Sequence, residues 1–362
     1  MSKRNEVMSW ADEAMFRAET IDRSEGPRAF LLSCNPDPLG SIAACAKAYI
    51  GEFVEDLGQI TDDERRYYLR EVQKSVLVMP LETVQMHFRI TGVTRGFTHQ
   101  MVRQRSAAYA QESTRFAVKD TVPVGDPPSI QGVKSRTERA ADITFRNPHM
   151  TAEEALNLAT PDSPEDKWRD TWDHAVELIS HAYNYMIDTG MPAEDARGIL
   201  PTNLLTQINY VTDLRGLKEH AGLRLCTQAQ FEWRQVWAQM ISAIKDYGKT
   251  QGYTTKLDDE YGDSYDDRSS AWQFREIANI FRPICYYRGR CQFESEMDRK
   301  CTIRERVNAN AQVGRESVEW DKTYDPENAY QDGPPRSGQV GGPVFIGAIH
   351  PAEWLLDPTA AR

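Results

Sequence analysis

The clearest hydrophobic pattern in the chain is an alternation over residues 83–91. Its apolar members share one face of an extended chain, and they are Val84, Met86, Phe88 and Ile90. A period of two with one apolar face predicts a half-buried β-strand. Residues 95–110 follow without a proline, and we interpret them as a helix placed directly after the strand.

Helical spacing dominates the flanking segments. Residues 41–56 and 61–75 are predicted helices, with Ser41 and Thr61 as their N-caps. A longer helix is predicted to begin at Ser163-Pro164 and to end at Gly190, because proline suits a first helical position and glycine suits the residue after a helix. Its apolar residues recur at helical spacing, and they are Trp168, Trp172, Val176, Ile179, Tyr183 and Met186.

Two further helices are predicted closer to residue 250. Asp213 is a candidate N-cap for a helix that runs to about Gly222. Thr227 with Gln230 resembles a capping box for another helix that runs to Gly248.

The chain changes character twice. Residues 119–160 are rich in Pro, Thr, Asp and charge, which predicts a long excursion with one short helix. Residues 255–270 are acidic and turn-rich, and residues 331–343 form a Gly/Pro-rich linker. We therefore predict an α+β catalytic core over residues 1–250, a mixed sheet with helices, followed by an accessory extension over residues 251–362.

Composition limits the classes of protein. The 362 residues are 40% hydrophobic, which is enough for a sizeable core. The chain has no apolar run long enough for a membrane helix, and its N-terminus has no apolar segment of a secretory signal. The net charge of −11 argues against binding a nucleic acid polymer. We expect a cytoplasmic protein with reduced thiols and no membrane partner.

Two arginine-rich segments are the candidates for chemistry. The first is RGFTHQMVRQRSAAYAQESTRF at residues 95–116. On a helix Arg103 shares a face with Gln100, whereas Arg105 points to another side, so this run suits two ligands or one ligand between subunits. Ser113 and Arg115 offer a hydroxyl and a fork of donors to a phosphate. The alternative is a solvated basic helix face.

The second segment covers residues 196–234. Arg197, Arg215 and Arg224 interrupt a set of predicted core positions, which are Leu200, Leu204, Leu205, Ile208, Leu214, Leu217 and Leu223. Arginines among core residues are costly unless they are paired or liganded. Ion pairs to Asp213, Glu219 or Glu232 and contacts to a ligand explain them equally well.

Together the two segments resemble the flavin-dependent thymidylate synthases. The signature of that family is Arg-His-Arg, seven residues, then Ser-x-Arg-Tyr/Phe, and this chain has Arg103-Gln104-Arg105, seven residues, then Ser113-Thr114-Arg115-Phe116. The lead-in PLETVQMHFRITGVTRGFTHQ also matches. Residues 196–234 match the block A-R-x-x-L-P-x-x-L-x-T … R-S-L … L-R … A-Q-x-E-I-R. The resemblance covers about residues 80–116 and 160–250.

The resemblance implies an activity and a site. The activity is methylation of dUMP at C5 to dTMP, with FAD as cofactor, methylenetetrahydrofolate as carbon donor and NADPH as reductant, in a homotetramer whose subunits share active sites. The residues implied to contact FAD are Gln100, Arg103, Gln104, Arg105 and Glu219. Those implied to hold the nucleotide are Gln111, Ser113, Arg115, Arg197 and Arg224. Arg224 is implied to face the pyrimidine, and it forms the catalytic set with Gln111 and Ser113.

Several positions depart from the family pattern. Gln104 replaces the central histidine, and Ala108 and Ala110 replace polar residues within the seven-residue gap. A glutamine keeps hydrogen-bonding capacity but does not carry a proton near neutral pH. Two alternatives therefore stay open: a variant that acts on another pyrimidine deoxynucleotide, such as dCMP, or makes a hydroxymethyl product, and a non-catalytic nucleotide-binding homologue.

Four cysteines form a separate candidate site. Cys285, Cys291 and Cys301 are close in sequence in the extension, and Cys226 lies in the second arginine block. Four thiolates are a ligand set for zinc or an iron–sulfur cluster. The sequence has no CxxC pair, so four unrelated buried thiols are the alternative.

Overall fold

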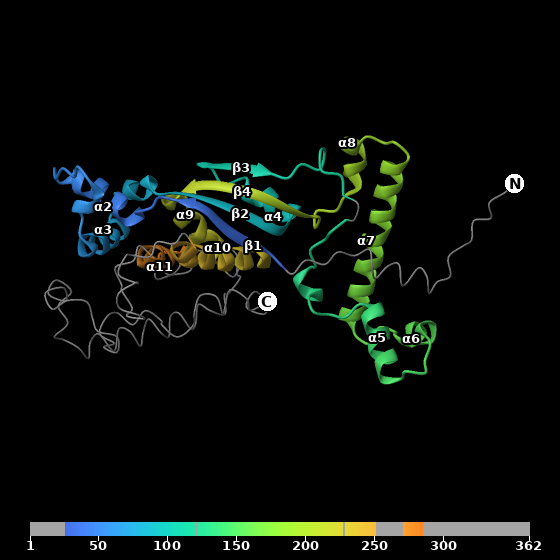
Figure 1. The fold of residues 1–362 in the computed structure, drawn as a ribbon. Helices are drawn as coiled ribbons and strands as arrows, with labels where there is room; N and C mark the ends of the chain where they lie inside the picture. The colour runs from blue at the N-terminus through green and yellow to red at the C-terminus, as the bar shows by residue number, and fades with distance from the viewer. Residues whose placement is uncertain (1–25, 120–121, 227–228, 251–270, 285–362) are drawn as a thin grey trace, which may run out of the picture. The chain divides into compact units, whose positions relative to one another are not determined.

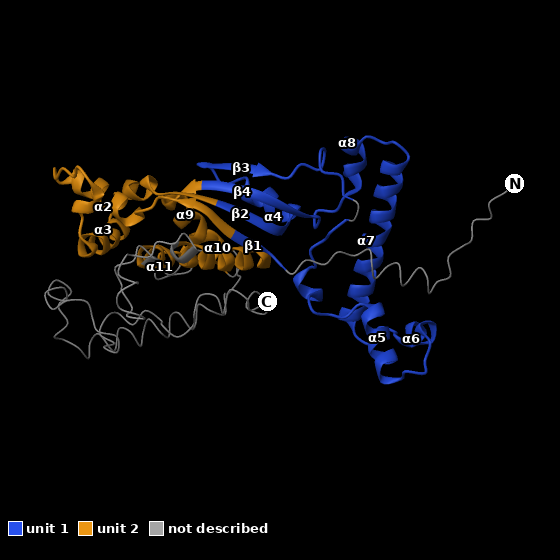
Figure 2. Ribbon diagram, in the orientation of Figure 1, with its two compact units in different colours: residues 1–29, 88–211 blue, residues 30–87, 212–362 orange. Residues whose placement is uncertain are grey.

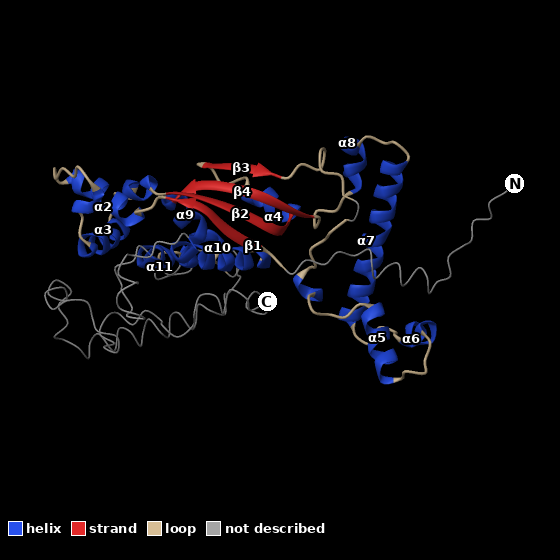
Figure 3. Cartoon of the chain, viewed as in Figure 1, coloured by secondary structure: helices blue, strands red, loops and turns tan. Residues whose placement is uncertain are grey.

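The computed structural model describes residues 26–119, 122–226, 229–250 and 271–284 (Figure 1). The strands are β1 (Arg28–Cys34), β2 (Gln85–Thr94), β3 (Ala107–Gln111) and β4 (Leu205–Asp213). They form one antiparallel sheet in the order β1-β2-β4-β3. Helices make up most of the remaining regular structure (Figure 3), so the predicted α+β class is confirmed.

The chain divides into two compact units (Figure 2). The first comprises residues 1–29 and 88–211, and the second comprises residues 30–87 and 212–362. The predicted boundary at residue 250 stays a prediction, because most of the extension lies outside the described residues.

Strand β2 follows the alternation that predicted it. Met86, Phe88 and Ile90 are fully buried, and so is Val84 just before the strand. The strand runs from Gln85 to Thr94, a few residues later than predicted. One apolar face therefore fixes which side of the strand meets the core.

The predicted helix over residues 95–110 is wrong in its second half. Helix α4 (Arg95–Met101) is only seven residues long, and β3 occupies Ala107–Gln111. Between them Ser106 has a φ of 63°, which turns the chain out of the helix. Residues 107–111 then pair with β4, a partner from a distant part of the sequence that local pattern does not reveal.

The first unit carries the helices of the excursion. They are α5 (Arg136–Arg146) and α6 (Ala152–Leu158), where one short helix was predicted, with the 3-10 turn η3 (Pro128–Ile130) before them. Ser135 with Glu138 and Thr151 with Glu154 form a capping box at the start of each helix. The two helices share a small core that includes Ala140 and Leu156.

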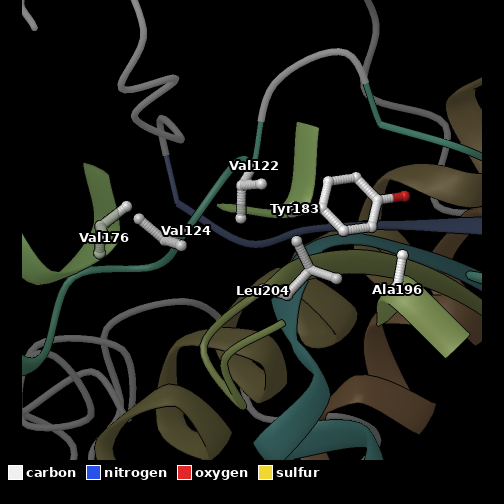
Figure 4. Packing of buried hydrophobic residues seen from close by; sticks show 6 residues of the cluster. All are labelled: Val122, Val124, Val176, Tyr183, Ala196 and Leu204. Carbon is white, nitrogen blue, oxygen red and sulfur yellow. The ribbon is translucent and has the colours of Figure 1, made fainter. Parts of the chain in front are cut away.

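Helix α7 (Pro164–Asp188) confirms the prediction for this segment. Ser163 caps it in a capping box with Asp166, and Gly190 follows it with a φ of 93°. A short helix α8 (Ala193–Ala196) and the 3-10 turn η4 (Arg197–Ile199) come next. Figure 4 shows the buried cluster that joins these segments, which consists of Val122, Val124, Val176, Tyr183, Ala196 and Leu204.

The second unit begins with α2 (Pro38–Tyr49) and α3 (Asp62–Lys74), with the 3-10 turns η1 (Leu57–Gln59) and η2 (Met79–Thr83) after each of them. Ser41 is not the N-cap of α2: the carboxylate of Asp37 accepts the Gly40 amide at 2.8 Å, so the helix starts before residue 41 and also ends earlier than residue 56. Thr61 does cap α3, as predicted.

Three helices complete this unit: α9 (Leu214–Arg224), α10 (Phe231–Thr250) and α11 (Ala271–Asn279). Asp213 caps α9 as predicted, whereas Leu223, a predicted core residue, is 52% exposed because it lies on the outer side of this helix. Helices α10 and α11 pack through buried aromatic side chains, including Tyr247 and Phe274, whose ring centroids lie 5.1 Å apart. Thr227 lies outside the described residues.

Candidate functional site

Two backbone hydrogen bonds position the start of α4 in the first unit. The amide of Arg95 donates to the carbonyl of Leu204 at 3.0 Å, and the amide of Gly96 donates to that of Thr202 at 2.8 Å. Thr94 caps the helix through the Phe97 amide. The turn after α4, residues 102–106, then presents Arg103 and Arg105 to solvent. The first arginine segment is thereby anchored to the second.

Arg103 and Arg105 lie in this turn and not on a helix. The inference that they face different sides of one helix is therefore wrong in its geometry, as is the helix face shared by Arg103 and Gln100. Both side chains are exposed, and neither guanidinium forms a hydrogen bond or an ion pair with any residue that the structure describes. Their N–H donors are therefore accessible from solvent.

Gln104 accepts a hydrogen bond from Tyr210, whose ring stacks on two other aromatic rings. The hydroxyl of Tyr210 donates to Gln104 Oε1 at 2.8 Å. The ring of Tyr210 stacks on Tyr109, with centroids 5.4 Å apart, and on Phe88, with centroids 6.5 Å apart. The hydroxyl of Tyr109 lies 2.9 Å from the carbonyl of Met101 and therefore secures the end of α4. Burial raises the pKa of Tyr109 to about 12, so its hydroxyl stays a donor.

Gln111 is the last residue of β3, and its side chain turns back to α4. Its Nε2 donates to the hydroxyl of Thr98 at 2.9 Å, and Thr98 is fully buried. That hydroxyl in turn donates to the carbonyl of Arg95 at 3.0 Å. The chain of hydrogen bonds fixes the orientation of the Gln111 amide and ties β3 to the first turn of α4.

Arg115 and Arg197 meet at Glu194. The guanidinium of Arg115 lies 2.7 Å from the Glu194 carboxylate, and Nε of Arg197 donates to the Glu194 carbonyl at 3.1 Å. Ser113 begins the turn that carries Arg115, and its hydroxyl accepts the Arg115 amide at 3.2 Å. Two arginines and a serine predicted to hold the nucleotide are therefore gathered in one region of the first unit.

The second unit contains the other predicted residues. Arg224 ends α9, and its guanidinium lies 4.7 Å from the centroid of the Trp233 ring. Burial lowers the pKa of Arg224. Glu219 lies 3.1 Å from Arg215, which also pairs with Glu82 at 2.5 Å. Of the two explanations for the arginines in this block, an ion pair accounts for Arg215.

Several residues of this region are not evident from the sequence. Tyr210 and Thr98 act through hydrogen bonds to predicted residues, and both are fully buried. Glu194 had no local signal in the sequence, because its carboxylate pairs with Arg115 from a distant part of the sequence, and its contact with Arg197 uses the backbone carbonyl. Tyr210 had none beyond its place in an apolar segment, because its partner lies 106 positions away in the sequence.

The predicted metal site stays a prediction. Cys285, Cys291 and Cys301 lie outside the described residues, and Cys226 is a partly exposed cysteine that forms no disulfide with a described residue. Within the described ranges no helix has the length and hydropathy needed to cross a membrane.

Comparison with known proteins defines the class of this chain. A family profile described as thymidylate synthase complementing protein (Thy1) matches residues 30–247. This range includes both arginine segments and all four strands except the first two residues of β1. The protein is therefore an enzyme with an α+β fold. The chain belongs to the thymidylate synthase complementing protein family, as its resemblance indicated.

Individual relatives agree with this assignment. The chain is 28% identical over 224 residues to a flavin-dependent thymidylate synthase of Geobacter sulfurreducens, covering 61% of this chain and 83% of that protein. It is 30% identical over 219 residues to a flavin-dependent thymidylate synthase of Pyrococcus furiosus, covering 60% and 78%.

Solved structures were also matched. One is a UMP/dUMP methylase PolB from Streptomyces cacaoi bound with 5-Br dUMP, at 20% identity, with 62% of this chain and 91% of that chain covered and a TM-score of 0.46. Another is thymidylate synthase X of Helicobacter pylori with FAD and dUMP, at 16% identity, with 60% and 92% covered and a TM-score of 0.41.

Proposed function

We propose that this protein methylates dUMP at C5 to give dTMP, with FAD as cofactor, methylenetetrahydrofolate as carbon donor and NADPH as reductant. Family membership supports the reaction class. The observation that carries the proposal is that the first unit displays two separate pairs of arginines: Arg103 with Arg105 on the turn after α4, and Arg115 with Arg197 around Glu194. One pair suits a dinucleotide cofactor and the other suits a nucleotide phosphate.

The residues of the turn fit FAD in their chemistry. Arg103 and Arg105 offer exposed guanidinium forks, which match the oxygens of a pyrophosphate in geometry and charge. Gln104, fixed by Tyr210, and Gln100 on α4 add amide groups beside them. Glu219 of the second unit is the remaining proposed contact. Bound FAD supplies hydride chemistry that no side chain provides, and the protein contributes binding and orientation.

The proposed nucleotide contacts divide by charge. Arg115, Arg197 and the hydroxyl of Ser113 bind the phosphate, where charge-assisted hydrogen bonds are strongest. Gln111 is oriented by Thr98 and is proposed to lie beside the pyrimidine. Arg224 is proposed to face the same ring, and a guanidinium with reduced access to water interacts more strongly with the polar edge of the base.

The oligomeric state, the cellular location and the ligands of the protein belong to the same proposal. We infer a homotetramer with active sites shared between subunits, located in the cytoplasm, with the nucleotide as its ligand and neither a nucleic acid polymer nor a membrane as partner. A zinc ion or an iron–sulfur cluster at Cys226, Cys285, Cys291 and Cys301 is a separate proposal. Metal analysis of the purified protein before and after substitution of Cys291 by serine tests it.

The test is an absorbance spectrum of the purified protein during anaerobic addition of NADPH, with and without dUMP. We expect oxidised flavin bands that bleach in the presence of NADPH, and conversion of dUMP to dTMP once methylenetetrahydrofolate is added. Protein that stays colourless after incubation with FAD contradicts the proposal. Nucleotide binding without any turnover would favour a non-catalytic homologue.

A second candidate is a variant with another pyrimidine deoxynucleotide or another one-carbon product. The observation that favours it is that Ala108 and Ala110 on β3 are exposed side chains where the family pattern has polar residues. Without these two polar side chains, the strand has fewer groups that can form hydrogen bonds with a neighbouring ligand, which changes the ligand that it suits. Mass spectrometry of products formed from dUMP and dCMP separates this candidate from the first.

A further inference from the structure

Arg224 and His220 share a contact with the ring of Trp233 in the second unit. Helix α9 places them four residues apart, and therefore on one face. The guanidinium of Arg224 lies 4.7 Å from the centroid of the Trp233 ring. The imidazole of His220 lies 4.8 Å from the same centroid, with the two rings at 79°. Trp233, in the first turn of α10, thus contacts both side chains of that face.

The environment of this tryptophan makes it a rigid platform. Trp233 is fully buried, and His220 is 6% exposed. Trp237, one helical turn further along α10, is also fully buried, and its ring centroid lies 5.9 Å from that of His220. Because the Trp233 ring is closely packed on all sides, it has one orientation. The guanidinium of Arg224 that contacts this ring is therefore held in one position.

The chemistry of the contact suits a positioning role. A guanidinium over an indole face is attracted by the quadrupole of the ring, and the attraction grows as water is removed. Arginine combines stacking on an aromatic face with a planar fork of N–H donors, so a single guanidinium serves both kinds of contact. Arg224 is only partly buried, so the platform fixes its position without enclosing it.

We propose that Trp233 is a positioning residue that holds Arg224 in the orientation that binds the pyrimidine nucleotide. The inference rests on the proposed function, in which Arg224 faces the pyrimidine. Trp233 stands at the isoleucine position of the block A-Q-x-E-I-R that the family shares, so this platform is a property of this chain's sequence. The tryptophan itself does not contact substrate; it acts through the arginine.

The experiment measures dUMP binding by calorimetry to the full-length protein loaded with FAD. Trp233→Ile is expected to weaken dUMP binding about tenfold, which corresponds to about 1.4 kcal/mol, because the arginine loses its cation–π contact. Trp233→Phe is expected to restore affinity to within about threefold, because a smaller aromatic face remains.

Trp237→Ile is the matched control. Trp237 is equally buried and packs on the same histidine, so its substitution is expected to lower the melting temperature by a similar amount. It should leave the dUMP affinity nearly unchanged, because the guanidinium of Arg224 rests on Trp233. Equal losses of affinity in Trp233→Ile and Trp237→Ile would show a general packing effect and overturn the inference.

A double substitution tests whether the tryptophan acts through the arginine. In an Arg224→Met background the Trp233→Ile change should cost no further dUMP affinity, since the side chain it positions is gone. An additional tenfold loss there would refute the positioning role. Failure of the wild-type protein to bind dUMP refutes the proposed function instead, so the two failures are distinguishable.

Discussion

Arg169 on α7 makes five hydrogen bonds from a side chain that is 1% exposed. Its Nη atoms donate to both oxygens of Asp126, at 2.9 and 2.6 Å, and to Asp173 at 3.3 Å. It also donates to the carbonyls of Ile130, at 2.8 Å, and Val133, at 3.1 Å. The arginine therefore fixes residues 126–133 to α7. These residues form the loop that follows the proposed phosphate-binding turn. We predict that Arg169→Leu is one of the most destabilising single changes in the first unit.

The exposure of the two carboxylates sets the size of the expected loss of stability. Removing one partner of a buried ion pair costs about 3–5 kcal/mol, because the remaining charges lose their compensation. Asp126 and Asp173 keep 17% and 16% of their side chains exposed, so water partly solvates the orphaned carboxylates. We therefore expect the lower end, about 3 kcal/mol. For a unit of this size the melting temperature should fall by about 6–12 °C.

Thermal unfolding followed by circular dichroism measures this effect. Lys167→Leu serves as the control, because Lys167 is an exposed residue of the same helix, and it should shift the stability by less than about 0.5 kcal/mol. A fall of less than 2 °C for Arg169→Leu would refute the reasoning, since it would mean that the two carboxylates are well solvated without the arginine.

Three further predictions concern the candidate site. Burial, and then the charge of Arg224, lower the pKa of His220 from 6.5 to about 3. Between these pH values the unfolded chain takes up a proton that the folded chain does not. The free energy of unfolding should therefore decline as the pH falls from 6.5 toward 3. His220→Phe should remove this decline between pH 6.5 and 5 in melting curves. Arg115→Met should weaken dUMP binding at least tenfold in calorimetry, since a charge-assisted hydrogen bond is worth about 1.5–3 kcal/mol. Tyr210→Phe should lower stability by about 1 kcal/mol and weaken FAD binding severalfold in fluorescence titrations, because Gln104 loses its donor.

Each of these has a result that contradicts it. An unchanged slope of melting temperature against pH in His220→Phe would show that other groups cause the acid sensitivity. Unchanged dUMP affinity in Arg115→Met would contradict a role of Arg115 in binding. The stability of this variant should stay nearly unchanged, because Arg115 and Glu194 are 51% and 56% exposed and such a pair contributes little to folding. Unchanged FAD affinity in Tyr210→Phe would mean that Gln104 does not contact the cofactor.

The sequence determined the features that depend on near neighbours. The alternation at residues 84–90 fixed the buried face of β2, and the helix starts at Thr61, Ser163 and Asp213 were correct, because caps and periodicity act within one or two turns. The two arginine blocks were likewise sufficient to identify the family, because their residues and spacing match its pattern in both segments.

Only the tertiary structure decided where those blocks change conformation and what they contact. Residues 107–111 have the composition of a helix, but pairing with β4 makes them a strand, and the turn before them brings Arg103 and Arg105 into solvent. The same holds for Gln104 and Tyr210, 106 positions apart, and for Arg115 and Glu194. Such contacts join segments that are distant along the chain, and a local pattern carries no information about a partner that folding alone brings near.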